Sequence, residues 1–308
     1  TFTADTAAGS KEVDLTLNLR MQYPETDTTH TIKSHRRYFI RNVIYVTNYE
    51  GSTAYENNDY LAEDTVYHKG LTIYYGKDPY LKPATLSECC YIEPGELYQM
   101  SHVDQTYEAL SRLGILKFIN INLEQVAEIG NDAWLDAYIL LSRGKKQGVT
   151  LELEGTNSEG DLGFGVGLTY QHRNLAKGSE MLTAKLRGAY ESISGNLDGL
   201  INDRYTEYAA EVGLTFPKFM SPFLSKSFKQ RMKASTEFAV SFNYQERPEY
   251  TRIIAGAGWK YKWNNRQNTE RRTFDFIDVN YVYLPHSTID FIDQIAPSNP
   301  LLRYSYED

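Results

Sequence analysis

The chain has 308 residues, a formal net charge of -8 and 41% hydrophobic residues. This length suits about two domains, and the negative charge argues against a general nucleic-acid-binding protein. The mean hydropathy of -0.50 argues against transmembrane helices, because no uncharged apolar window has the length that such a helix needs. Alternating membrane strands also average to a polar hydropathy, so a membrane β-barrel remains open.

The sequence begins without a secretion signal. Thr1 is followed by neither a basic nor an apolar segment, whereas a protein of the outer membrane needs such a leader for export. We therefore expect the sequence to be a mature or excised fragment.

The first 145 residues predict a compact α/β module, preceded by a strand and a linker. The expected elements are strands at 11–20, 36–46 and 71–75, helices near 85–91 and from 101 onward, and strands at 116–123 and 133–141. Polar composition predicts a linker at 24–35 and a loop at 50–69. In the second helix Ser101 is the expected N-cap, Val103, Tyr107 and Leu110 the apolar stripe, and Gly114 the stop.

Two segments of this region share a pattern. The strand at 11–20 and the segment 134–143 both alternate apolar and polar residues, and each carries Asp in its opening turn, Asp14 and Asp136. Their spacing suits one β-α-α-β-β module, so we expect the end of one module and a linker over 1–35 and a complete module over 36–145. Coincidental similarity of two amphipathic strands is the alternative.

The two cysteines, Cys89 and Cys90, are neighbours. A trans peptide holds adjacent Cα atoms ~3.8 Å apart, below the ~4.4 Å at which ordinary disulfides begin. We interpret them as small, partly buried side chains, and a redox pair is the alternative.

From Gln147 onward, long segments alternate apolar and polar residues with a period of two. The expected strands are 147–157, 161–173, 180–192, 204–216, 235–246, 252–263 and 273–284. One face carries Val149, Leu151, Leu153, Leu162, Phe164, Val166, Leu168, Tyr170, Phe238, Val240, Phe242 and Tyr244. The charges of the other face are Glu152, Glu154, Lys185, Arg187, Glu191, Glu207, Glu211, Glu237, Lys260 and Lys262. Strands of ~10 residues or more with this alternation are typical of a sheet between lipid and water.

The sequence contains no recognisable catalytic pattern. GxSxG, Walker and HExxH motifs are absent, and the histidines do not fall at metal-ligand spacing. Gly163, Gly165 and Gly167 alternate, which favours small residues on a lumen wall over a phosphate-binding loop. Glu152 and Glu154 share one strand face, which favours a solvated lumen over an acid/base dyad. We therefore expect a protein without enzyme activity, metal or cofactor.

Several segments resemble the BamA/TamA outer-membrane assembly family. YEALSRLGILKFINI and LDAYILLSRGKKQGVTLELEGTNSEGDLGFGVGLTYQHRNLAKGSEMLTAKLRGAYES resemble the junction of its last POTRA domain with its barrel. ELEGTNS, the YxHRNLxxGxE turn, FNYQERPEYTR, VNYVYLPHSTIDFID and NPLLRYSYED resemble the TamA-like branch. The resemblance covers residues 11–308.

This resemblance implies an α+β POTRA module over 36–145, followed over 146–308 by antiparallel transmembrane β-barrel strands. These would be about seven to eight strands, the N-terminal part of a larger barrel. The barrel would lie in the bacterial outer membrane and the module in the periplasm. The family's loop-six arginine motif and closing aromatic strand would lie beyond Asp308, so we expect open sheet edges here.

The expected function is that of an outer-membrane β-barrel insertase or translocation component. An edge strand presents unpaired N–H and C=O groups that can template an incoming strand, and in lipid each unpaired group costs several kcal/mol. By the resemblance, the templating edge is the first barrel strand, with the candidate residues Gly148, Val149, Thr150, Leu151, Glu152, Leu153 and Glu154. The expected partners are nascent outer-membrane proteins and outer-membrane lipids.

Other functions remain open. The chain could be a TamA-like partner of a periplasmic lipid-bridging protein in phospholipid transport, or a structural barrel without transport. A soluble β-rich binding domain is disfavoured, because its strands would be nearer ~5–6 residues. The sequence does not distinguish protein insertion from lipid transport, and it identifies neither accessory partners nor the number of upstream POTRA modules.

The connection at 217–234 combines basic and bulky apolar residues without an acidic one. With a periplasmic module, this connection and 264–272 would both face the periplasm. The candidate lipid-interface residues are Lys218, Phe223, Lys226, Phe228, Lys229, Arg231 and Lys233. There are two alternatives. The connection could be an ordinary solvated turn, or it could contact a POTRA module or an accessory partner.

Overall fold

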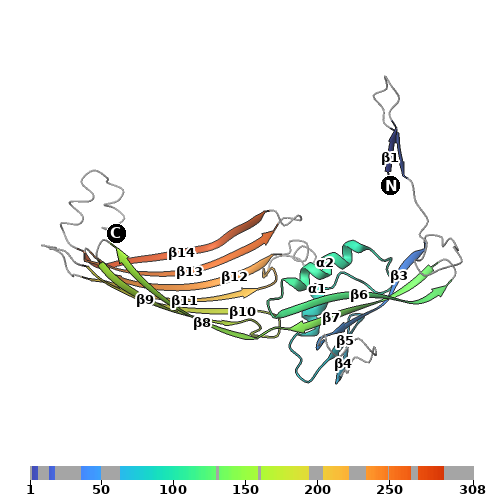
Figure 1. Cartoon of the computed structure of the whole chain (residues 1–308), viewed down its shortest axis with the longest axis horizontal. Coiled ribbons are helices and arrows are strands. Elements are labelled where there is room, and N and C mark those ends of the chain that lie inside the picture. The colour runs from blue at the N-terminus through green and yellow to red at the C-terminus, as the bar shows by residue number, and fades with distance from the viewer. Residues whose placement is uncertain are drawn as a thin grey trace.

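The computed structural model describes residues 2–5, 14–17, 36–49, 63–129, 132–158, 161–193, 204–221, 234–248, 250–264 and 270–287. These residues form a two-stranded, a five-stranded and a seven-stranded sheet, with two α-helices. Figure 1 shows the five-stranded sheet and its helices at one end of the long, curved seven-stranded sheet. The fold is therefore mostly antiparallel β-sheet, with a smaller α/β part.

The N-terminal hairpin consists of β1 (Phe2–Asp5) and β2 (Asp14–Leu17), which pair antiparallel. The strand expected at 11–20 is thus described over 14–17, and the rest of it lies outside the described residues. The assignment of 1–35 to the end of a preceding module stays a prediction.

The α/β module follows the expected β-α-α-β-β order, with a hairpin inserted after its first strand. Its elements are β3 (Arg37–Val46), β4 (Asp64–His68), β5 (Leu71–Tyr75), α1 (Pro83–Cys89), α2 (Met100–Ser111), β6 (Leu116–Ile129) and β7 (Asp132–Arg143). The sheet order is β4-β5-β3-β7-β6, and β3 runs parallel to β5 and β7. Neither helix of the described residues is long and apolar enough to cross a bilayer.

The module has one hydrophobic core between the sheet and the helices. Val43, Ile73, Leu86, Leu110 and Ile139 are completely buried in it. This burial explains the short apolar strands and the apolar stripe of α2, since each element must cover one face.

The central strands of the module are joined by an ion pair. Arg41 donates from Nε and Nη2 to the carboxylate of Asp136, at 3.0 and 2.6 Å. The side chain of Asp136 is buried, and its hydrogen bonds to Arg41 raise the pKa of the guanidinium. Asp136 lies within β7, inside the strand expected at 133–141.

Three local predictions in the module were wrong. Residues 64–68 form β4 rather than a loop, an edge strand with only partial burial. Gln99, not Ser101, is the N-cap of α2, and it makes no side-chain capping bond; the helix ends at Ser111, ahead of Gly114. Tyr107 is half exposed, because Thr106 takes the buried position and donates to the carbonyl of His102 at 2.8 Å.

The seven-stranded sheet is an antiparallel meander of long strands. Its members are β8 (Gln147–Ser158), β9 (Asp161–His172), β10 (Met181–Ser192), β11 (Arg204–Phe216), β12 (Ser235–Glu246), β13 (Tyr250–Asn264) and β14 (Arg271–Ser287). Each strand pairs with its neighbours in sequence, from β8 at one edge to β14 at the other. The seven expected strands are confirmed, and within the described residues the sheet is not closed.

The strand register sorts the side chains onto two faces. Leu151, Leu168 and Leu186 lie side by side on one face, whereas Glu152, Gly167 and Arg187 lie side by side on the other. The same register places all ten charged residues expected on the polar face together on that face; these are Glu152, Glu154, Lys185, Arg187, Glu191, Glu207, Glu211, Glu237, Lys260 and Lys262. Many of the large apolar side chains of the other face are exposed, among them Leu151, Leu186 and Val240.

Candidate functional site

The candidate site is the free edge of β8. The strand pairs with β9 in an unbroken register from Gln147 opposite His172 to Ser158 opposite Asp161. No strand of the described residues pairs with its other side. In an antiparallel pair, alternate residues turn their N–H and C=O away from the partner. The edge therefore presents a row of free backbone groups along the expected residues Gly148, Val149, Thr150, Leu151, Glu152, Leu153 and Glu154.

The side chains of this edge differ between the two faces of the sheet. Val149, Leu151 and Leu153 are 67%, 63% and 76% exposed on the apolar face. Glu152 and Glu154 lie on the polar face, where Arg187 of β10 approaches Glu154 to 2.9 Å. A strand added here would have to match this alternation, because a slip of one residue reverses every side chain.

The glycines of β9 make room for the carboxylates of β8. A Cβ atom at Gly165 would lie 3.5 Å from Glu154 Oε2, and one at Gly167 would lie 3.3 Å from Glu152 Oε2. A Cβ atom at Gly163 would collide with Thr156 Oγ1. The alternating glycines thus share one face, as expected, and the acidic side chains lie across them.

Ion pairs continue across the polar face. Lys185 pairs with Glu211 at 3.2 Å, and Lys262 pairs with Glu237 at 2.5 Å. Further along, Lys260 lies 3.4 Å from Asp275. Neighbouring strands therefore compensate each other's charge on the face that the sequence assigns to water.

The start of β8 is tied to the α/β module by Asp78. Its carboxylate accepts hydrogen bonds from Arg143 at 2.6 Å and from Lys146 at 3.1 Å. These hydrogen bonds, from Arg143 first and then Lys146, lower the pKa of Asp78 below its usual value. The loop after β5 is thereby attached to the short link between β7 and β8.

A second attachment is the turn between β9 and β10, residues 173–180, which we name the docking turn. Asn174 is buried in it and donates from Nδ2 to the carbonyl of Tyr80 at 2.6 Å. The backbone N–H of Lys82 donates to the carbonyl of Lys177 at 2.9 Å. The sequence pattern singled out this turn, but it did not identify Tyr80 as its partner because the two segments are distant in sequence.

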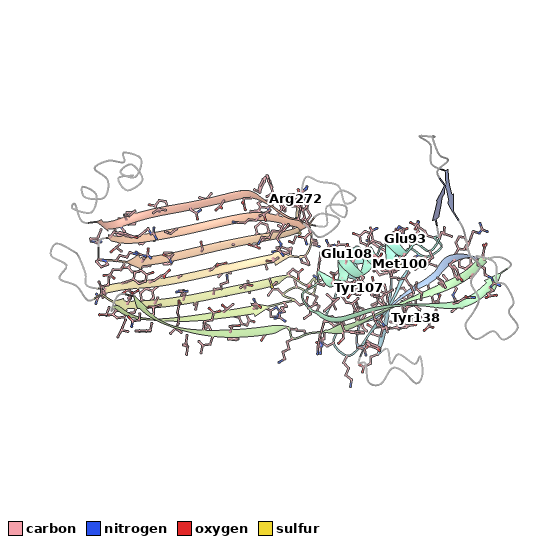
Figure 2. All side chains as sticks on the ribbon, turned by 45° about the horizontal axis from the view of Figure 1, so that its top comes forward. Glu93, Met100, Tyr107, Glu108, Tyr138 and Arg272 are labelled. Atoms are coloured by element: carbon pink, nitrogen blue, oxygen red, sulfur yellow. The ribbon has the colours of Figure 1, made fainter. Side chains whose placement is uncertain are left out.

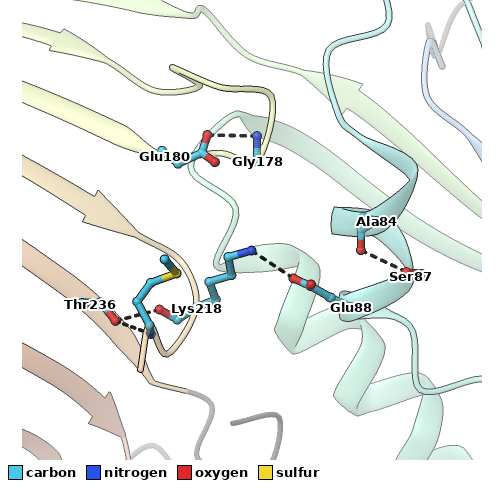
Figure 3. Close-up of polar contacts among 8 residues, drawn as sticks. Ala84, Ser87, Glu88, Gly178, Glu180, Lys218 and Thr236 are labelled. Carbon is cyan, nitrogen blue, oxygen red and sulfur yellow. Dashed lines mark hydrogen bonds and ion pairs between the residues drawn. The ribbon is translucent and has the colours of Figure 1, made fainter. Parts of the chain in front are cut away.

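The lipid-interface candidates are described only in part. Figure 3 shows Lys218 reaching Glu88 of α1, with Nζ 3.5 Å from Oε2. Thr236 donates to the carbonyl of Lys218 at 2.9 Å. Lys218 therefore contacts the module, which was one of the alternatives. The remaining candidates lie outside the described residues; they are Phe223, Lys226, Phe228, Lys229, Arg231 and Lys233.

The adjacent cysteines are free thiols in and after α1. Burial raises the pKa of Cys89 to about 12 and also raises the pKa of Cys90, whose thiol donates to the carbonyl of Ile92 at 3.3 Å. Both fit the interpretation as partly buried side chains. Among the residues that the structure describes, no cluster of His, Cys, Asp and Glu has metal-binding geometry.

Comparisons with known proteins give structural matches only. No protein-family model matches the chain. No curated protein matches it either. Among solved structures it is similar to BamA from Haemophilus ducreyi lacking POTRA domains 1–3, with 12% identity and a TM-score of 0.36 over 88% of this chain and 54% of that one. It is also similar to CdiB from Acinetobacter baumannii, with 9% identity and a TM-score of 0.34 over 85% of this chain and 67% of that one. The chain thus spans about half of the BamA chain.

Proposed function

We propose that the chain is part of an outer-membrane β-barrel insertase or translocation component, in which the edge of β8 templates substrate strands by β-augmentation. The observation that carries this proposal is the side of β8 that no strand of the described residues pairs with, on a long strand with Leu151 and Leu153 exposed on its apolar face. In a bilayer, unpaired backbone groups cost several kcal/mol each, so an incoming strand gains much by pairing there.

The proposed arrangement has the sheet in the outer membrane and the α/β module, as a POTRA domain, in the periplasm. The module adjoins the ends of the strands where β8 begins and β9 ends, so a periplasmic substrate would reach the edge beside it. The proposed partners are nascent outer-membrane proteins and outer-membrane lipids, with a periplasmic accessory protein as a further candidate.

Proline substitutions at the edge test the proposal. Alternate residues of β8 donate to β9 or to the free edge, so Leu151→Pro and Glu152→Pro remove a donor on opposite sides. We expect one of the two variants to remain folded and to lose insertion of a substrate barrel into liposomes. Leu151→Ala and Glu152→Ala, which keep the backbone donors, should retain insertion.

The outcome against the proposal is equally definite. A folded proline variant that inserts substrates at the wild-type rate would overturn templating at β8. Equal damage from Ala and Pro would assign the effect to side-chain packing instead. Depletion of the protein distinguishes phospholipid transport from protein insertion. If the protein transports phospholipids, its depletion should disturb the lipid asymmetry of the outer membrane before the levels of outer-membrane proteins fall.

A further inference from the structure

The docking turn holds an unfavourable backbone conformation. Lys177 and Ser179 have φ values of 60° and 62°, in the left-handed region that residues with a Cβ atom rarely adopt. Glu180 stabilises this shape, since its Oε2 accepts from the backbone N–H of Ala176 and of Gly178, each at 3.0 Å. Figure 3 shows the bond to Gly178. Such conformations persist only where the surroundings determine them strongly.

The surroundings are the α/β module. Asn174 donates to the carbonyl of Tyr80 at 2.6 Å, and it accepts from the backbone N–H of Ser179 at 2.9 Å. The hydroxyl of Ser179 in turn accepts from the backbone N–H of Ile115 at 3.3 Å. Asn174 and Ser179 are both nearly completely buried. Removing a partner from such a contact leaves a buried polar group unsatisfied, which costs more than the bond itself contributes.

The contacted segments lie at different places in the module. Tyr80 precedes α1, whereas Ile115 lies between α2 and β6. Two exposed ion pairs also join the module to the sheet, namely Asp78 with Lys146, which directly precedes β8, and Glu88 with Lys218, which follows β11. The module is therefore held at separate points around the base of the sheet, and it cannot pivot without breaking buried hydrogen bonds.

We propose that Asn174 and Ser179 are positioning residues that lock the α/β module to the seven-stranded sheet, so that the module and the β8 edge move as one body. The lock follows from the contacts of the docking turn. Its consequence, a constant angle at which a substrate strand meets β8, rests on the proposed function.

A pair of glycine substitutions tests the lock. Ser179→Gly and Lys177→Gly both place glycine at a positive φ, so both relieve the same backbone strain. Only Ser179→Gly removes the acceptor for Ile115, because Lys177 contributes its backbone carbonyl, which glycine keeps. Lys177→Gly is therefore a matched control.

The readout is a distance between the two parts of the protein. The labelled positions are Tyr107→Cys of α2 and Arg272→Cys of β14, both of which Figure 2 labels. Cys89 and Cys90 are replaced by Ala, so that spin labels attach only at these two positions. Pulsed electron paramagnetic resonance then measures the distribution of distances between the two labels. The distribution should be narrow in the parent protein and in Lys177→Gly, and it should broaden roughly twofold or more in Ser179→Gly. Asn174→Ala should broaden it similarly.

A broad distribution in the parent protein, or an unchanged width in both Ser179→Gly and Asn174→Ala, would overturn the lock. The measurement does not depend on activity. Failure of the β8 proline test would overturn the proposed function and leave a narrow distribution in place, so the two ideas fail separately.

Discussion

Arg187 of β10 and Glu154 of β8 form an ion pair at 2.9 Å, although the whole of β9 lies between their strands. Glu154 lies opposite Gly165, and Arg187 lies opposite Gly167, so no β9 side chain separates them. The glycines thus let the polar face of β8 interact with the strand after the next.

Filling the glycine row should destabilise the sheet. A Cβ atom at Gly163 meets Thr156 and lies 3.1 Å from Glu191 Cβ, so Gly163→Val should lower the free energy of unfolding by ~1–3 kcal/mol. Gly155 is the control, since a Cβ atom there meets nothing within 4 Å. Denaturant unfolding in detergent measures both, and equal effects of Gly163→Val and Gly155→Val would contradict the steric explanation.

The ion pair between Lys218 and Glu88 allows a test of whether Lys218 acts through the α/β module or at the lipid interface. Both side chains are about half exposed at a separation of 3.5 Å, so we expect a coupling of only ~0.2–1 kcal/mol. A double-mutant cycle with Lys218→Glu, Glu88→Lys and the charge-swapped double variant measures this coupling at low salt. Zero coupling energy, together with weaker insertion of Lys218→Glu into anionic liposomes, would contradict the module contact and support a role of Lys218 at the lipid interface.

The ion pair of Asp78 should make stability depend on pH. The pKa of Asp78 is lower in the folded protein, because Arg143 and Lys146 donate to its carboxylate. The pair's contribution is therefore complete above the unfolded-state pKa and is lost as the pH falls through the lower folded-state value. Asp78→Asn should accordingly be less stable than the parent at pH ~7, and the difference should vanish in acid. A difference in unfolding midpoint that stays constant down to pH ~2 would contradict this assignment.

The thiol of Cys89 should resist alkylation while the protein is folded. Burial raises its pKa to about 12, so very little thiolate exists near neutral pH. Iodoacetamide at pH ~8 should modify Cys89 slowly in the folded protein and rapidly in denaturant, as followed by mass spectrometry. Rapid modification of the folded protein would show an accessible thiolate and favour the redox alternative.

The strands of the larger sheet could be predicted because a single physical rule determines them. Apolar and polar residues alternate along most of each strand, with a break at Phe276 and Ile277 of β14, and hairpin connections keep neighbours in sequence adjacent in space. Expected and observed ends therefore differ by only a few residues, as for β10, expected at 180–192 and observed at Met181–Ser192.

The local errors arose where burial is partial or capping is absent. β4 is an edge strand in which only Val66 packs against the core, so DTVYH lacks a clear alternation. The N-cap of α2 is Gln99, which makes no side-chain capping bond, so the polar Ser101, which lies inside the helix, does not mark its start.

The docking turn could not be interpreted from sequence for a different reason. Asn174 bonds to Tyr80 across 94 positions, and no local pattern encodes such a partner. A polar, glycine-containing turn between two strands reads as an ordinary loop. The segment HRNLAKGSE matches the turn motif of the resemblance. Its contact with Tyr80, however, can be recognised only in the folded structure.

The ion pairs on the polar face leave an excess of carboxylates. Among the described residues, Glu152, Glu191 and Glu207 form no ion pair on this face, and Asp275 and Asp278 share one lysine, Lys260. The register also places Arg252 on this face, where it donates to Gln245, and the carboxylates still outnumber the cations. If this sheet forms part of the wall of a water-filled pore, that pore would concentrate cations and repel anions. Ionic currents through it would then be cation-selective, and the selectivity would weaken as the salt concentration rises.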